Sequence, residues 1–140
     1  MYQAYLRINC LRKLHASLLS KMNNHPLNLA LRFILELLAL YIVGYWGYTK
    51  GEGVYKYIFM LLIPLILATA WAVFRVPGDP GRAPVAVNGI IRLTIEASVF
   101  GIAVFALFDT GYDKYGWILL AVLIVHYAIS YDRLFWIIKQ

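Results

Sequence analysis

The stretch YIFMLLIPLILATAWAVF, residues 57–74, contains no charged side chain, and the charge-free run extends from Lys56 to Arg75. A helix that spans a bilayer needs about 20 predominantly apolar residues. The run is continuous and lacks the apolar–polar alternation that is typical of strands in a membrane barrel. The sequence therefore predicts a membrane-spanning helix over residues 55–74.

Three other blocks are also continuous and predominantly apolar, at residues 27–48, 87–108 and 115–138. The chain of 140 residues is 62% hydrophobic and 14% charged, whereas a soluble domain is roughly half apolar and a quarter charged. We therefore expect one all-α domain over residues 27–140, a transmembrane bundle of four helices. Short connections predict an up-down-up-down order with both termini on one side.

Small residues and one proline mark helix packing within the predicted spans. Ala68 and Ala72 form a small-xxx-small pair, and Ala97 and Gly101 form another. Such pairs allow close approach of two helices in a membrane. Pro64 lies near the centre of the second span, where we expect it to kink the helix.

The basic residues are unevenly distributed between the two predicted sides of the membrane. The side with the termini carries Arg7, Arg12, Lys13, Lys21, Arg75, Arg82 and Lys139. The other side carries Lys50, Lys56 and Lys114, diluted by Glu52, Asp109 and Asp113. Because cytoplasmic loops are enriched in Lys and Arg, both termini are predicted to be cytoplasmic. If the native start were Met22, the count would be three against three, and the orientation would depend on Arg32, Arg92 and Arg133.

Residues 1–26 form a basic N-terminal extension. Leu11, Leu14 and Leu18 recur at helical spacing beside Arg12 and Lys13, which is typical of an amphipathic surface helix. A disordered segment, or an extension translated from an upstream start, stays open as an alternative, and a mitochondrial presequence is a less favoured one. The extension has no continuous apolar segment of the kind found in secretory signals.

Two Arg-x-x-x-Glu pairs lie inside the apolar blocks, Arg32 with Glu36 and Arg92 with Glu96. A charged side chain near the bilayer centre costs roughly 2.5–3.5 kcal/mol on insertion scales. We therefore expect these side chains to face the interior of the bundle. Side chains four residues apart are neighbours on a helix, so each Arg is expected to pair with the Glu of its own helix.

The polar residues at membrane depth are predicted to form two layers. Glu36, Glu96 and His126 lie near the middle, and Arg32, Arg92, Asp132 and Arg133 lie about one turn nearer the cytoplasm. Three carboxylates then balance three guanidiniums. Two interpretations stay open: a network that fixes helix register, or a binding or conduction site of the kind that intramembrane ionisable residues usually mark.

These ordered charges resemble a known family. The stretch LNLALRFILEL at residues 27–37, followed by Gly44-Tyr-Trp-Gly47, is similar to the opening of the YrdB-like family of small bacterial membrane proteins. Arg92-Leu-Thr-Ile-Glu96 with Phe100-Gly101, and the segment HYAISYDRL at residues 126–134, resemble two further segments of that family. The resemblance implies a bacterial multi-pass protein, and it supplies no activity because the family is one of unknown function.

The sequence offers no recognisable catalytic or metal-binding constellation. It has no glycine-rich phosphate loop and no Gly-x-Ser-x-Gly motif. His126 is the only histidine at membrane depth, and Cys10 is the only cysteine. We therefore expect no enzymatic activity, no metal, no cofactor and no nucleic-acid partner.

The functional expectation is a non-enzymatic binding or accessory module in the inner membrane of a bacterium. Its expected partners are the lipid bilayer and either further copies of itself or another membrane subunit. The alternative is a small oligomeric transporter or channel with a path through Glu36, Glu96 and His126. The candidate site consists of Arg32, Glu36, Arg92, Glu96, His126, Asp132 and Arg133.

Overall fold

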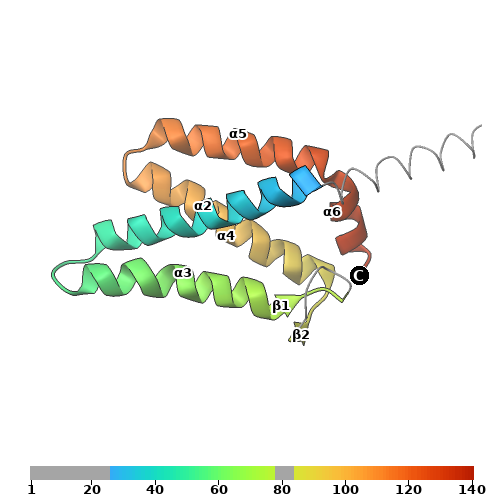
Figure 1. The fold of residues 1–140 in the computed structure, drawn as a ribbon, viewed down its shortest axis with the longest axis horizontal. Coiled ribbons are helices and arrows are strands. Elements are labelled where there is room, and N and C mark those ends of the chain that lie inside the picture. The colour runs from blue at the N-terminus through green and yellow to red at the C-terminus, as the bar shows by residue number, and fades with distance from the viewer. Residues whose placement is uncertain (1–25, 78–83) are drawn as a thin grey trace, which may run out of the picture.

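The computed structural model describes residues 26–77 and 84–140, and these are mostly helical (Figure 1). The helices are α2 (Pro26–Lys50), α3 (Tyr55–Val73), α4 (Gly89–Asp109), α5 (Asp113–Ile129) and α6 (Tyr131–Ile138). All but the final residue of the predicted N-terminal extension, residues 1–26, lies outside the described residues. The all-α prediction is confirmed for the described residues, except for two very short strands.

The helix ends follow from local sequence signals. Pro26 occupies the first position of α2, where a missing N–H costs nothing. The Asn88 side chain caps α4 by accepting a hydrogen bond from the Ile91 N–H at 2.9 Å. Gly53 and Gly111 adopt positive φ angles of 54° and 79° in the two turns, a conformation that glycine accepts without steric cost.

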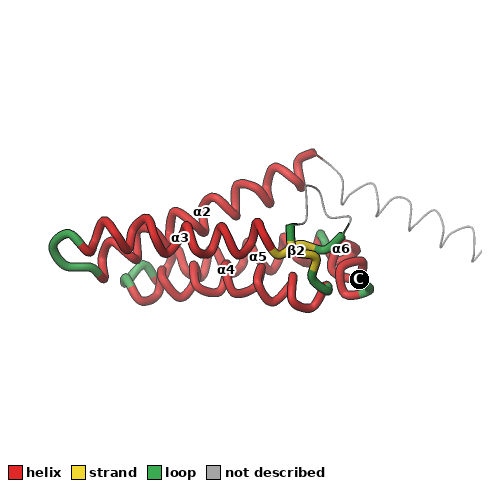
Figure 2. Tube along the Cα trace, turned by 90° about the horizontal axis from the view of Figure 1, so that it is seen from below, coloured by secondary structure: helices red, strands yellow, loops and turns green. Residues whose placement is uncertain are grey.

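Three helices are long and apolar enough to cross a membrane, namely Ala30–Lys50, Tyr55–Val73 and Gly89–Asp109. Helices α5 and α6 together reach the same criterion only as one broken span, which gives up to four spans. The turns after α2 and α4 lie at one end of the bundle, and the start of α2 lies at the other end (Figure 1). This end also holds the short strands (Figure 2).

The fourth predicted span, residues 115–138, is not one continuous helix. It breaks at Ser130, and α6 bends away from α5 by 70°. Two contacts with α4 hold α6 in this direction. Arg133 reaches the carboxylate of Glu96, and Gly89 packs so closely on Ile137 that an added Cβ would collide with its carbonyl group.

The core lies where α2, α4 and α5 meet. Its buried apolar residues are Leu35, Ala39, Ile42, Val43, Val99, Phe100, Ala103, Ala106, Leu119 and Leu123. Helix α3 contributes no fully buried residue, so it lies at the edge of the bundle against α2. It runs through Pro64 without a break.

Glycines of α2 bring it close to α3 near the turn that joins the two helices. A Cβ added to Gly47 would lie 2.6 Å from the Phe59 carbonyl oxygen, and one added to Gly44 would lie 3.0 Å from that of Met60. Gly101, in the predicted pair on α4, has nothing within 4 Å of an added Cβ. Helices α2 and α3 are therefore tight near their turn, and they diverge towards the other end (Figure 1).

A two-residue parallel ladder, which the sequence analysis did not predict, follows α3. Strand β1 (Phe74–Arg75) pairs with β2 (Val85–Ala86). The ladder brings the end of α3 beside the start of α4, and it places Val76 in the interior.

Candidate functional site

Glu96 on α4 is the centre of a buried polar cluster and is only 1% exposed. Its Oε1 accepts hydrogen bonds from Arg133 Nη1 at 3.1 Å and from the Tyr127 hydroxyl at 3.0 Å. Its Oε2 accepts from Arg133 Nη2 at 3.2 Å and lies 3.8 Å from Arg32 Nη2. Side chains of α2, α5 and α6 thus converge on one carboxylate of α4. A two-pronged Arg–carboxylate pair of this kind is among the stronger side-chain interactions.

Arg32 joins the two glutamates. Its Nε donates to Glu36 Oε1 at 2.9 Å, and its Nη2 faces Glu96 Oε2. The predicted pair on α2 is therefore confirmed. Because Arg32 contacts both carboxylates, the charges of α2 and α4 belong to a single cluster.

The second predicted pair, Arg92 with Glu96, is wrong. Arg92 Nη1 donates to the carbonyl oxygens of Trp71 at 2.6 Å and Phe74 at 3.0 Å. The last carbonyls of a helix have no partner within that helix and carry its negative dipole end, so α3 offers Arg92 a strong acceptor site. Glu96 instead pairs with the guanidinium groups of Arg32 on α2 and Arg133 on α6.

Trp71 is a residue of the site that the sequence analysis missed. The guanidinium of Arg92 lies 4.7 Å from the centre of its ring and that of Arg75 lies 5.2 Å away. Tyr127 was also missed, although its position beside His126 in a predicted span was an available signal. A hydroxyl that is withdrawn from water needs a hydrogen-bond partner, and Glu96 supplies it.

His126 and Asp132, two further residues of the predicted site, differ in their position relative to the cluster around Glu96. His126 is buried on α5 with its ring 5.8 Å from that of Tyr127. Its Nδ1 has no hydrogen-bond partner within the part of the chain that the structure describes. Asp132 is half-buried on α6. Within residues 26–77 and 84–140 it makes no ion pair with Arg32, Arg92 or Arg133, so its predicted membership of the network is wrong.

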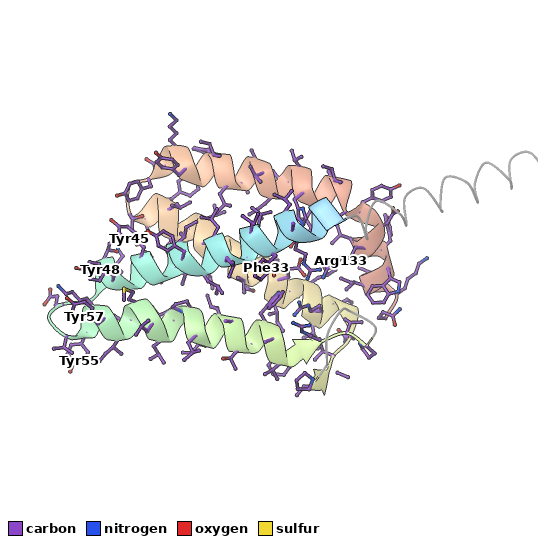
Figure 3. The ribbon with its side chains drawn as sticks, viewed as in Figure 1. Phe33, Tyr45, Tyr48, Tyr55, Tyr57 and Arg133 are labelled. Carbon is purple, nitrogen blue, oxygen red and sulfur yellow. The ribbon has the colours of Figure 1, made fainter. Side chains whose placement is uncertain are left out.

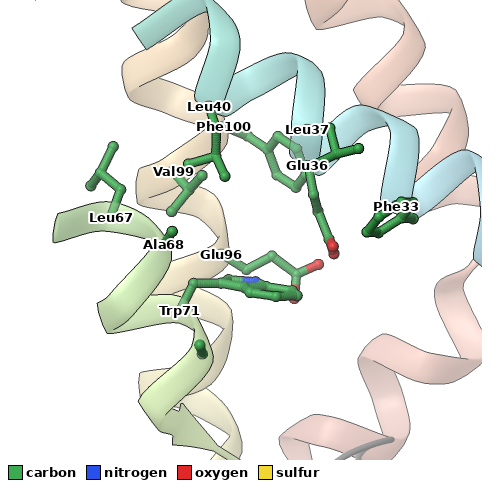
Figure 4. Close-up of a pocket in the computed structure, with 11 residues that line it drawn as sticks. Phe33, Glu36, Leu37, Leu40, Leu67, Ala68, Trp71, Glu96, Val99 and Phe100 are labelled. Atoms are coloured by element: carbon green, nitrogen blue, oxygen red, sulfur yellow. The ribbon is translucent and has the colours of Figure 1, made fainter. Parts of the chain in front are cut away.

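A cavity of about 210 Å³ lies beside the cluster, between α2, α3 and α4. Its walls are apolar apart from Glu36, Glu96 and the indole of Trp71, and the apolar lining residues are Phe33, Leu37, Leu40, Leu67, Ala68, Ala72, Val99 and Phe100. The carboxyl groups of Glu36 and Glu96 point towards one another, between Phe33 and Trp71 (Figure 4). Ala68 and Ala72, the predicted small pair of α3, line this space.

The opposite end of the bundle is rich in aromatic side chains. Tyr45, Tyr48, Tyr55 and Tyr57 lie there, far from Arg133 (Figure 3). Lys56 Nζ lies over the rings of Tyr48 and Tyr57 at 5.2 Å and 5.0 Å. Tyrosines and lysines of this kind are typical of a membrane–water interface.

Asp109 ties α4 to α2 at this aromatic end. Its Oδ2 accepts a hydrogen bond from Trp46 Nε1 at 2.6 Å, and it pairs with Lys50 Nζ at 2.6 Å.

In residues 26–77 and 84–140, no three His, Cys, Asp or Glu side chains are grouped so that they would hold a metal ion.

Comparison with known proteins gives two matches. Residues 30–124 match a family described as "Protein of unknown function (DUF2568)". The chain is also 39% identical over 116 residues to "Uncharacterized protein YrdB" of Bacillus subtilis (strain 168), a match that covers 81% of this chain and 94% of the relative. These findings confirm the resemblance inferred from the ordered charges. No solved structure matches the chain significantly.

Proposed function

The chain belongs to the DUF2568 family of unknown function, and we propose that it is a non-enzymatic binding module of the bacterial cytoplasmic membrane. We further propose four spans in up-down-up-down order with both termini on the cytoplasmic side. The apolar helices support membrane insertion. The excess of Lys and Arg in the loops and tails on the side of the termini supports this orientation.

The cavity beside Glu36 is the observation that carries the binding proposal. At about 210 Å³ it is larger than the roughly 150 Å³ engineered cavity that holds benzene. Apolar walls with a few convergent polar groups are the usual form of a small-molecule site. The cavity therefore suits a small apolar molecule, or one short chain of an amphiphile.

The charged cluster supports this role by fixing the cavity in advance. Glu96 links α4 to α2, α5 and α6 through Arg32, Tyr127 and Arg133. Helices α2 and α4 supply most of the cavity wall, so the cluster holds that wall in one arrangement. A preformed site binds more tightly because less ordering occurs upon binding.

The lining also supports entry from the bilayer. Phe33 and Leu37 line the cavity and are 59% and 51% exposed. Both lie in the first half of α2, and α2 and α3 diverge towards the end of the bundle where α2 begins (Figure 1). A ligand dissolved in the hydrocarbon phase would thus reach the cavity sideways, without crossing water.

The second candidate is a transporter or channel with a path through Glu36, Glu96 and His126. The observation in its favour is the buried Nδ1 of His126 beside the cluster. Against it, Arg32 holds Glu36, and Arg32 and Arg133 hold Glu96. A carboxylate that relays protons must release its partners during each cycle, and ion pairing opposes that release. The binding module is therefore favoured.

The binding test uses 1-bromooctane, an apolar probe whose bromine quenches indole fluorescence. A chain that keeps only Trp71 is made by replacing Trp46, Trp117 and Trp136 with Phe, and it is placed in lipid nanodiscs. We expect saturable quenching of Trp71. Ala68→Phe fills the cavity and should abolish the saturable part, whereas Ala97→Phe, on the exposed face of α4, should leave it unchanged.

The result that overturns the binding proposal is quenching that rises linearly with probe and is the same in both phenylalanine variants. The transport alternative is tested separately, by proton and ion flux into liposomes that contain the wild-type protein. Flux that Glu36→Gln abolishes in a folded protein would replace the binding proposal with the transport alternative.

A further inference from the structure

We propose that the cavity selects amphiphiles whose polar group is an uncharged hydroxyl, which donates a hydrogen bond to the carboxyl group of Glu36. This inference rests on the proposed binding function, and it names the chemical class of the ligand. Three observations carry it: the hydrogen-bonding capacity left in the cavity, the balance of charge around it, and its apolar walls.

The remaining acceptor capacity belongs to Glu36 rather than Glu96. Both oxygens of Glu96 already accept from Arg133, and Tyr127 and Arg32 complete its surroundings. Glu36 is bound through Oε1 by Arg32 Nε. A carboxylate offers about four acceptor positions, and the Glu36 side chain lies in the cavity wall (Figure 4). A donor on the ligand would therefore bind Glu36.

The charge around the cavity excludes an organic cation as the preferred ligand. Two carboxyl groups, Glu36 and Glu96, are matched by the guanidiniums of Arg32 and Arg133. An ammonium group would thus enter a region with no net negative charge, and it would lose its hydration as well.

An anionic head group and a pure hydrocarbon are disfavoured for different reasons. An anion would face the oxygens of Glu36 and Glu96 directly, because both groups point into the space between Phe33 and Trp71 (Figure 4). An alkane would cover the Glu36 acceptor without bonding to it, and an unmade hydrogen bond to a buried group is costly. A hydroxyl has one donor and no charge, so it satisfies Glu36 without either cost.

The experiment is a competition between four eight-carbon compounds that differ only in their polar end. Octan-1-ol, octane, octylamine and octanoate each compete with 1-bromooctane for Trp71 in the single-tryptophan protein. Concentrations are expressed per lipid in the nanodisc, because the four compounds partition differently into the bilayer. We expect octan-1-ol to displace the probe at about one-tenth of the concentration of octane, as one hydrogen bond to a charged acceptor allows.

Two substitutions test the role of Glu36 itself. In Glu36→Leu the advantage of octan-1-ol over octane should vanish. Glu36→Gln keeps a carbonyl acceptor and should retain part of that advantage, and it remains informative if the leucine variant fails to fold. The matched control is Asp132→Asn, outside the cavity, which should leave the order of the four compounds unchanged.

The outcomes separate this inference from the binding function. Equal displacement by octan-1-ol and octane refutes the hydroxyl selectivity and leaves the binding function standing. Tighter binding of octylamine or octanoate refutes it in favour of a charged ligand. If 1-bromooctane itself gives no saturable quenching in any folded variant, the binding function and the selectivity fail together.

Discussion

Removal of the negative charge at Glu96 is the perturbation with the largest expected effect on stability. Glu96→Gln leaves the guanidinium of Arg133, itself 8% exposed, beside a neutral amide. Loss of one member of a buried ion pair costs about 3–5 kcal/mol, because the remaining charge is left uncompensated. The free energy of unfolding of a folded protein is only about 5–15 kcal/mol. Glu96→Gln should therefore remove a large share of it.

A double-mutant cycle measures how much of this loss of stability comes from the interaction between Glu96 and Arg133. Arg133→Met should by itself destabilise the protein by a similar amount, since it leaves Glu96 with fewer donors. The double variant should cost clearly less than the sum, because the charge that each single variant exposes is then absent. We expect a coupling free energy of about 2–3 kcal/mol, near the upper end for residues in direct contact.

The assay is the free energy of unfolding in mixed micelles, followed by circular dichroism as a denaturing detergent is added. Tyr127→Phe should cost less than Glu96→Gln, about 1.5–3 kcal/mol for one hydrogen bond to a charged group. Asp132→Asn is the control beside Arg133 on α6 and should change stability by no more than about 0.5 kcal/mol. A cost below about 1 kcal/mol for Glu96→Gln, with no coupling to Arg133, would refute the argument.

Three further predictions concern helix contacts and topology. Gly47→Leu should push α3 away from α2 and lower the unfolding midpoint in mixed micelles. The control Gly101→Leu should leave the midpoint unchanged, because an added Cβ there meets nothing within 4 Å. Equal effects of the two substitutions would contradict the tight contact between α2 and α3. Gly89→Leu should displace α6 and speed hydrogen–deuterium exchange in residues 131–138, and unchanged exchange there would contradict the docking of α6 on α4. In a cysteine-free background, Glu52→Cys should react with a membrane-impermeant maleimide added outside the cell and Pro84→Cys should not; labelling of both would remove the proposed topology.

The helices themselves could be predicted from the sequence because the signal for them is local. Continuous apolar runs, Pro26 and the glycine-containing turns fix the position of each helix within a few residues of the structure. The break at Ser130 could not be predicted in this way. It depends on Gly89 and Arg133 meeting partners that are far away in the chain, and no periodicity within residues 115–138 encodes those contacts.

Most charged residues of the candidate site were predicted, but Asp132 was included wrongly, Tyr127 and Trp71 were missed, and the pairing was predicted only in part. Arg32 and Glu36 pair as expected from their spacing. Arg92 and Glu96 have the same spacing, yet the free carbonyl groups at the end of α3 attract Arg92. Helical spacing says which side chains are able to meet, whereas the choice among several acceptors depends on the tertiary structure. The same limit explains why Trp71 was missed.

The bidentate bond between Glu96 and Arg133 joins residues 37 positions apart in the chain, which has a consequence for biosynthesis. A ribosome produces the chain from the N-terminus, so α4 leaves it well before α6. Arg32 already exists at that moment and is the partner that the nascent chain has ready for Glu96. The second partner becomes available only when translation has passed residue 133. Packing of α4 against α2 and closure of the bundle by α6 therefore cannot be simultaneous during synthesis, and a chain that stops between the two has Arg32 but not Arg133 available for Glu96.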